Sequence, residues 1–318
     1  MSTIDQAVAA AGTAIPDVIT GHIGGESVPV DTSAKHLGVY FPGTGEQIAS
    51  LQEDDARAVA TAVSTARESF KARGVVSAST ATRQTVFRTA AQLIGIMPRS
   101  WRCWSASARD CPSSHLASRQ VPRPPITWIF ADYIGVMAGE TFEQLPGYQT
   151  VVTRQPAGVA ALFAPWNAPL ALASMQIASS LAFGNAAVLK PSEFTPLSVL
   201  RMVALIEEAG LPPGTLNVVN GSGAVTGAAL AGSATLIASP SRAVGKRAAG
   251  HGGGCRESHP VHFELGGKSA NIIFDDADFD RALDGSLVNI FSNSGQICIA
   301  GSRFWFSAVS LRRSLKHS

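Results

Sequence analysis

A stretch of 35 residues without a charged side chain, residues 155–189, constrains the fold of this chain more than any other feature. Pro165 and Pro169 interrupt it, so neither piece is long enough to cross a bilayer as one helix. A strand buried on both faces at 159–163, followed by a buried helix at about 170–183, fits the pattern better. We therefore expect this stretch to form the centre of a globular core, without membrane insertion.

The alternation of strand and helix continues down the chain. Apolar runs and their spacing predict strands at 186–189, 216–219 and 236–237, and helices at 195–209, 224–230 and 244–249. Upstream, Glu53, Asp54 and Asp55 open a predicted helix that ends at Gly74, and residues 82–94 form another. Strand and helix in this repeated order predict an α/β fold with a doubly wound parallel sheet, of the Rossmann-like kind.

Two motifs in the last third of the chain carry the chemistry. FELGGKS at 263–269 contains Glu264, and FSNSGQIC at 291–298 ends in Cys298, 34 residues further on. A thiolate adds readily to a carbonyl, and the resulting thioester needs water activated by a positioned carboxylate for its release. The glycines after Glu264 permit a tight turn near a ligand, and the polar run before Cys298 suits a loop that presents a thiol.

With their flanks and spacing, these two motifs resemble the NAD(P)-dependent aldehyde dehydrogenases. Further segments resemble the same family in the same order, over roughly two-thirds of the chain. They are IGGE at 23–26, PGTGE at 42–46, FAPWNAP at 163–169, KPSE at 190–193, GLPPG at 210–214 and LNVV at 216–219.

The resemblance implies a site for oxidising a small-molecule aldehyde to a carboxylic acid with NAD. Cys298 would be the nucleophile that forms the thiohemiacetal and thioester, Asn167 the donor to the oxyanion, and Glu264 the base for hydrolysis. Lys190 and Glu193 would bind the adenosine ribose hydroxyls, and a carboxylate there favours NAD over NADP. Other cofactor-binding positions implied are Phe163, Trp166, Gly223, Ser241 and Gly266. The chain lacks a G-x-G-x-x-G signature, so the cofactor rests on the resemblance alone.

The resemblance also implies two domains. We expect an NAD-binding domain at 1–262 and the start of a catalytic domain at 263–318, incomplete because family members continue further. The segment used for homo-oligomerisation in the family is expected to be missing. Pro240 stands where the family has a glycine in the turn over the cofactor pyrophosphate, and proline removes an N–H there.

Residues 95–129, 232–260 and 304–318 do not resemble the family. They hold three of the four cysteines and four of the five tryptophans, namely Cys103, Cys111, Cys255, Trp101, Trp104, Trp128 and Trp305. We hypothesise that the coding frame is disturbed in these stretches, which resequencing of the DNA tests. A clean open frame would reject the hypothesis.

Composition excludes several function classes. The net charge is +2 and no Lys/Arg-rich run with interleaved aromatics occurs, so nucleic-acid binding is not expected. The first residues lack a cationic start before an apolar core, so no secretory signal is expected and the cytoplasm is the predicted compartment. No metal site is expected, because glycines and Pro260 separate His251, Cys255, His259 and His262. Asp276, Asp278 and Asp280 are interpreted as an acidic helix start, not a calcium loop.

Three alternatives to an active dehydrogenase remain open. A truncated relic would keep part of the fold and lose dehydrogenation. A CoA-dependent acylating relative would exchange the thioester, although Glu264 favours hydrolysis. A nucleotide-binding module would bind NAD and leave Cys298 unreactive. The sequence does not select among aldehydes.

Overall fold

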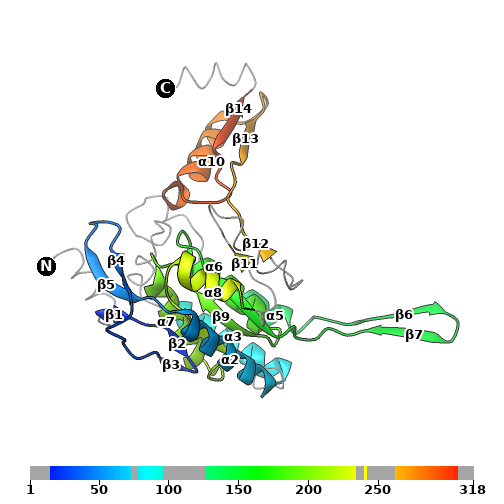
Figure 1. Cartoon of the computed structure of the whole chain (residues 1–318). Helices are drawn as coiled ribbons and strands as arrows, with labels where there is room; N and C mark the ends of the chain where they lie inside the picture. The colour runs from blue at the N-terminus through cyan, green and yellow to red at the C-terminus, as the bar shows by residue number, and fades with distance from the viewer. Residues whose placement is uncertain (1–14, 73–77, 96–125, 234–239, 242–261, 307–318) are drawn as a thin grey trace.

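A five-stranded sheet forms the centre of the protein (Figure 1). The computed structural model describes residues 15–72, 78–95, 126–233, 240–241 and 262–306. The strand order is β3-β2-β10-β9-β8. Strands β8 (Val159–Phe163), β9 (Ala186–Lys190) and β10 (Leu216–Val218) run parallel to one another. The short strands β2 (His22–Ile23) and β3 (Glu26–Ser27) continue the sheet in antiparallel orientation.

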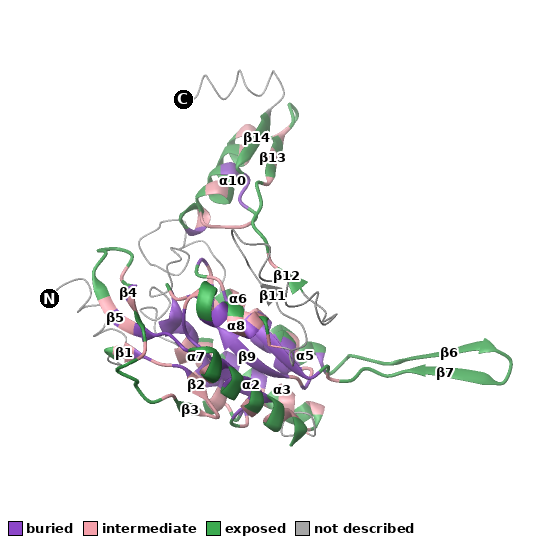
Figure 2. Ribbon diagram, in the orientation of Figure 1, coloured by how far each residue is buried: buried purple, intermediate pink, exposed green. Residues whose placement is uncertain are grey.

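Helices cover both faces of this sheet, which confirms the doubly wound α/β fold (Figure 2). One face packs against four helices: α3 (Thr80–Gly95), α5 (Ile126–Tyr133), α6 (Pro169–Leu181) and α7 (Pro196–Glu208). The other face packs against α2 (Ala56–Lys71) and α8 (Ala228–Ala231). Every residue of β9 is buried, as expected of a parallel strand covered on both sides.

Local sequence explains where the central helices begin. Both α6 and α7 have proline at the first position, where a missing N–H costs nothing because that donor has no partner inside the helix. Helix α2 begins after Asp55, whose carboxylate accepts from the N–H groups of Arg57 and Ala58 at 2.9 Å. Of the three acids expected to open this helix, only Asp55 caps it. Helix α2 ends at Lys71; the expected end at Gly74 lies outside the described residues.

The single helix expected at 224–230 is wrong in detail. The chain forms a π-helical turn, η2 (Gly223–Gly227), and then the short α8. Ser222 precedes η2, and its hydroxyl accepts from the N–H of Val225 at 3.3 Å. π-Helical turns are rare and are often found at functional sites.

Two smaller sheets flank the core. In one, β5 (Gln47–Gln52) lies between β1 (Val18–Ile19), to which it is parallel, and β4 (His36–Tyr40), to which it is antiparallel. The other is a hairpin of β6 (Glu140–Leu145) and β7 (Tyr148–Val152), in which every residue is exposed. The hairpin projects away from the rest of the protein (Figures 1 and 2).

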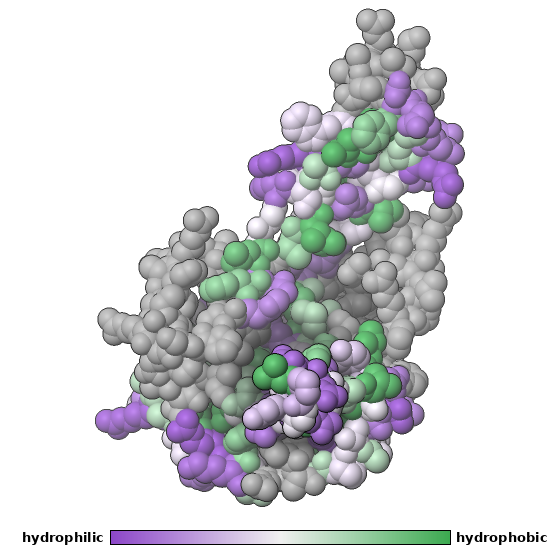
Figure 3. Space-filling view, turned by 90° about the vertical axis from the view of Figure 1, so that its right-hand side faces the viewer, coloured by the Kyte–Doolittle hydropathy of each residue, from purple (hydrophilic) through white to green (hydrophobic). Residues whose placement is uncertain are grey.

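The last described part of the chain leads into a separate lobe (Figure 1). Strands β11 (Pro240–Ser241) and β12 (His262–Phe263) pair in parallel beside the core. The lobe comprises β13 (Ala270–Ile273), α10 (Phe279–Phe291), the 3-10 turn η3 (Ser292–Gly295) and β14 (Arg303–Phe306), with β13 and β14 parallel. Several apolar side chains of α10 are exposed, and Figure 3 shows green hydrophobic groups among polar ones on this lobe.

Some expectations concern residues outside the described ranges. These include the strand at 236–237, the helix at 244–249 and most of the three atypical stretches. Within the described ranges, no helix is long and apolar enough to span a membrane. No three metal-ligating side chains gather there either. Asp278 caps α10 by accepting from the N–H of Arg281 at 3.2 Å, so the acidic helix start is confirmed.

Candidate active site

The carboxyl ends of β8, β9 and β10 meet at one edge of the central sheet. Phe163 of β8 pairs with Lys190 of β9, and the N–H of Ala164 donates to the Lys190 carbonyl at 3.0 Å. The N–H of Val219 donates to the carbonyl of Leu189 at 3.0 Å, so β10 ends at the same level. Ligands of open α/β sheets bind at this edge. Two predicted cofactor-binding residues, Phe163 and Lys190, therefore lie where a ligand is expected.

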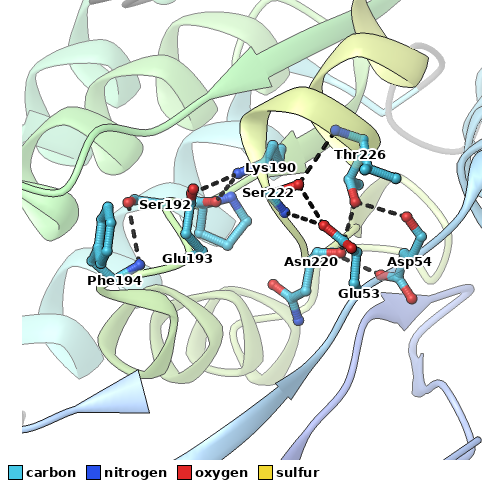
Figure 4. Close-up of polar contacts among 11 residues, drawn as sticks. Glu53, Asp54, Lys190, Ser192, Glu193, Phe194, Asn220, Ser222 and Thr226 are labelled. Carbon is cyan, nitrogen blue, oxygen red and sulfur yellow. Dashed lines mark hydrogen bonds and ion pairs between the residues drawn. The ribbon is translucent and has the colours of Figure 1, made fainter. Parts of the chain in front are cut away.

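Lys190 is buried and forms an ion pair with Glu193. Its Nζ donates to the carbonyl of Pro191 at 2.9 Å and to Oε2 of Glu193 at 3.4 Å (Figure 4). Burial lowers the pKa of Lys190, and the negative charge of Glu193 opposes that shift. Glu193 is partly exposed, with 28% of its side chain accessible. These contacts use two of the three ammonium donors, and the carboxylate faces solvent, so the pair can bind hydroxyl groups.

The loop after β10 lies beside this pair. A Cβ added to Gly227 of η2 would lie 3.6 Å from Cδ of Lys190, which places the turn against the lysine side chain. A Cβ added to Gly223 would meet no atom of the described residues within 4 Å, so among them the surface at this predicted cofactor-binding position is open.

Two acidic residues that the sequence suggested only as helix-opening acids hold this loop. Glu53 accepts from the backbone N–H of Ser222 at 3.0 Å and from its hydroxyl (Figure 4). Asp54 Oδ2 accepts from the N–H of Asn220 at 2.7 Å, and the hydroxyl of Thr226 donates to the Asp54 carbonyl at 2.7 Å. The contacts join positions 166 to 172 residues apart, so no local pattern in the sequence could have revealed them.

Asn167 contacts the loop that carries Cys298. Its side-chain Nδ2 donates to the carbonyl of Gln296 at 2.6 Å. In the other direction, Nδ2 of Asn293 donates to the carbonyl of Asn167 at 2.7 Å. The structure thus brings the predicted oxyanion donor to within two residues of the predicted nucleophile along the chain. Cys298 is a free, half-buried thiol.

The loop before Cys298 has an unusual backbone. Asn293, Ser294 and Gly295 have φ values of 54°, 55° and 73°, three consecutive residues in the left-handed region. Non-glycine residues seldom adopt this conformation, and it costs about 1–2 kcal/mol per residue. The buried side chain of Asn293 compensates, because its Nδ2 also donates to the carbonyl of Gln296 at 3.2 Å. The side chain of Asn293 therefore stabilises the strained backbone of the loop before Cys298.

The segment after β12 passes beside the same loop. A Cβ added to Gly267 would lie 3.0 Å from the carbonyl oxygen of Cys298, so the backbone approaches closely there. The carboxylate of Glu264 does not pair with the thiol. It lies 3.2 Å from Nε2 of His262 and lines a cavity of about 420 Å³ with β8 and α6. The predicted base and the predicted nucleophile therefore lie on neighbouring segments, with no hydrogen bond between their side chains.

The other predicted cofactor residues occupy varied places. Trp166 lies in the β8–α6 connection and is 39% exposed. Gly266 is exposed, and an added Cβ there would meet no atom within 4 Å in the part of the chain that the structure describes. Ser241 and Pro240 form β11, which pairs with β12. Pro240 is the first residue of this strand, a position where the missing N–H is tolerated.

The chain is similar in sequence to a known protein family and to several of its characterised members. Residues 30–311 match the family model described as "Aldehyde dehydrogenase family". Human retinal dehydrogenase 2 is 37% identical over 284 residues, which cover 86% of this chain and 54% of that protein. The mitochondrial aldehyde dehydrogenase family 2 member B4 of Arabidopsis thaliana is 36% identical over 277 residues, which cover 85% of this chain and 51% of that protein. The chain thus spans about half the length of the curated relatives it matches.

Solved structures agree with the sequence matches. An NAD+ complex of aldehyde dehydrogenase from Bacillus cereus superposes with a TM-score of 0.85 at 28% identity, covering 100% of this chain and 64% of that one. Indole-3-acetaldehyde dehydrogenase complexed with NAD+ superposes with a TM-score of 0.88 at 27% identity, covering 99% and 64%. The family model covers most of the chain, and these structures share its fold, so the protein belongs to the aldehyde dehydrogenase family.

Proposed function

We propose that this protein oxidises an aldehyde to a carboxylic acid with NAD, using Cys298 as nucleophile. The observation that best supports the proposal is the contact of the Asn167 side chain with the Cys298 loop. An amide donor beside a thiol is the arrangement that stabilises an oxyanion formed by attack on a carbonyl. Gln296, whose carbonyl accepts from Asn167, lies two residues before the thiol.

In the proposed mechanism, the Cys298 thiolate adds to the aldehyde carbon and forms a thiohemiacetal. In this step one N–H of the Asn167 side-chain amide donates to the oxygen that gains negative charge. When bound, NAD supplies the acceptor for the hydride that leaves this carbon. Glu264 then takes a proton from water as the water attacks the thioester, and the acid and the free thiol are released. For this step the Glu264 carboxylate must turn from His262 toward Cys298. The backbone at Gly267, three residues after Glu264, already lies close to the Cys298 carbonyl.

The described residues fit an adenosine group at the edge of the sheet. Lys190 and Glu193 offer an ammonium and a carboxylate to the ribose hydroxyls, and Gly223 leaves open surface beside them. A carboxylate at this position disfavours a 2'-phosphate, which supports NAD over NADP. Several structural neighbours are NAD+ complexes, which supports the same choice.

We place the division between an NAD-binding domain and the start of the catalytic domain near residue 262. The separate lobe that begins at β13 supports this division. A reducing compartment such as the cytoplasm would keep the thiol of Cys298 free.

The test is formation of NADH by the purified chain with NAD and a panel of aliphatic and aromatic aldehydes. Cys298→Ala should abolish turnover. Glu264→Gln should leave a burst of one NADH per site and then stall, because hydride transfer precedes the step that needs the base. Equal activity of Cys298→Ala and the parent chain would contradict the assignment.

Alkylation separates the alternatives if no NADH forms. Iodoacetamide should modify Cys298 at a rate that changes when NAD is added, provided that the cofactor and the thiol share one site. Calorimetric binding of NAD with an unreactive Cys298 would indicate a nucleotide-binding module. Release of acyl-CoA on addition of CoA would indicate the acylating relative.

A further inference from the structure

Glu53 is buried at the junction of β5 and α2, and among the described residues its carboxylate has only hydrogen-bond donors as partners. Its side chain is 5% exposed. One carboxylate oxygen accepts from the N–H of Ser222 at 3.0 Å and from the Ser222 hydroxyl (Figure 4). The other accepts from Nζ of Lys35 at 3.0 Å. Burial raises the pKa of Glu53, but the hydrogen bonds from Ser222 and Lys35 outweigh it and lower the pKa overall. The group is therefore an ionised carboxylate with charge-assisted hydrogen bonds.

The contact between Glu53 and Ser222 fixes the start of η2. The Ser222 hydroxyl donates to Glu53 and accepts from the N–H of Val225 at 3.3 Å, so one residue links the carboxylate to the first turn. Next to it, Gly221 has φ 147°, and a Cβ there would lie 2.0 Å from the Thr226 hydroxyl and 3.0 Å from Cγ of Glu53. The backbone thus packs directly on the Glu53 side chain.

The same turn forms one side of the predicted adenosine site. Gly223 follows Ser222, and Gly227 at the other end of η2 lies against Lys190. The charge of Glu53 also acts on Lys190. Burial lowers the pKa of this lysine, and the negative charges of Glu193 and, to a smaller extent, Glu53 raise it. Glu53 therefore influences both the Gly223 turn and the Lys190–Glu193 pair.

We propose that Glu53 is a positioning residue for the adenosine end of the cofactor, because its carboxylate sets where the Ser222–Gly223 turn lies relative to Lys190. The inference rests on the proposed NAD-dependent function and adds to it a residue that acts through Ser222. Loss of this carboxylate moves or loosens the turn, so the adenosine group loses one wall of its site while the groups around Cys298 stay in place.

The test compares three variants by calorimetric titration with NAD and with AMP. The partners of the Glu53 carboxylate, Ser222 and Lys35, are both donors. In Glu53→Gln the amide NH2 group would therefore face a donor and lose that hydrogen bond. We expect NAD and AMP to bind about tenfold more weakly, the loss typical of a hydrogen bond to a charged group. Ser222→Ala should act in the same direction, and Ser222→Thr, which keeps the hydroxyl, should restore binding. Aldehyde turnover at saturating NAD should change less than the KM for NAD.

Glu68→Gln is the matched control. Glu68 lies on the exposed face of α2 and accepts from the hydroxyl of Ser64 at 3.3 Å, so it repeats the Glu–Ser pair far from η2. Its affinity for both ligands should equal that of the parent chain.

The outcomes distinguish the inference from the function on which it rests. If the parent chain binds neither NAD nor AMP, the proposed function and the inference about Glu53 are both overturned. If the parent chain binds and Glu53→Gln binds equally well, only the inference is overturned, even where the melting temperature falls. If Glu53→Gln does not fold, Ser222→Ala and Ser222→Thr decide by the same criterion.

Discussion

Asp54 is a buried acid that forms no ion pair with any cation in the described part of the chain. It is 3% exposed, and its Oδ2 accepts from the N–H of Asn220 at 2.7 Å. Burial is the main reason that the pKa of Asp54 is raised, to about 6. The negative charge of Asp55 also raises this pKa, whereas the hydrogen bond from Asn220 lowers it. The folded protein thus binds a proton at Asp54 more tightly than the unfolded chain does.

This pKa predicts how stability depends on pH. Between the ordinary value of 3.8 and about 6, the folded state holds the proton and the unfolded state does not, so stability falls as pH rises. The loss amounts to on the order of 3 kcal/mol by neutral pH. Asp54→Asn, which is neutral at every pH, should therefore be more stable than the parent at pH 7 and similar at pH 4. Urea unfolding across this range measures it.

Asp284→Asn serves as the control for replacing an aspartate by asparagine, because Asp284 is exposed on α10. If Asp54→Asn is less stable than the parent at pH 7, the prediction is contradicted. The hydrogen bond from the Asn220 N–H would then stabilise the ionised carboxylate by more than burial destabilises it.

Some site residues could be predicted from short motifs in the sequence, and others could not. The predictions for Asn167 and Lys190 place each beside an expected partner, because short motifs carry them. Asn293 and Ser294 adopt left-handed backbone without the glycine that would announce it. Asparagine tolerates this conformation better than most residues, but the contact of Asn293 with the Asn167 carbonyl spans 126 positions, and a local pattern does not contain it.

At the scale of elements, β9 is the strand on which both cores depend. Val188 packs in the core under α2, and its neighbour Leu189 packs in the core under α6 and α7. Both are fully buried. Because its apolar side chains are packed on both faces, truncation of either residue should destabilise the protein.

We expect Leu189→Ala to lower the free energy of unfolding by about 2–5 kcal/mol, because the packed core leaves a cavity. Leu145→Ala removes the same atoms from the β6–β7 hairpin, where Leu145 is 62% exposed. It should change the free energy of unfolding by less than about 0.5 kcal/mol. Urea denaturation monitored by circular dichroism measures both, and equal losses would contradict the assigned core.

The elements differ in how well the sequence predicted them. Strand β8 and helix α7 lie within one or two residues of their predicted bounds, since burial imposes a clear apolar pattern and Pro196 marks a start. The β6–β7 hairpin has no buried face, so no apolar periodicity announces it. The π-helical turn at Gly223 depends on Glu53 and Asp54 from a distant element, which a local pattern does not contain.

At the scale of the whole molecule, the sheet joins segments from opposite parts of the chain. The N–H of Gly24 donates to the side chain of Asn217 across 193 positions, whereas the N–H of Ala187 donates to the Thr215 carbonyl within one βαβ unit. Loop closure over the longer span costs about 2 kcal/mol more. The doubly wound core was predictable because residues 159–219 alternate locally, but the addition of β2 to β10 was not.

This difference predicts an order of folding. In refolding followed by pulsed hydrogen exchange, the amide of Ala187 should gain protection before that of Gly24. Local contacts form sooner because their loops close more readily. Simultaneous protection of both amides would indicate that the whole sheet forms in one step.

The antiparallel pairing of β2 with β10 has a consequence for the protein during its synthesis. A ribosome adds about 5–20 residues per second, so β2 waits about 10–40 s for β10 to be made. Through that interval, the first strands of the chain expose their hydrogen-bonding groups to any other nascent strand. Strand β2 thus leaves the ribosome well before β10, the strand with which it pairs in the sheet.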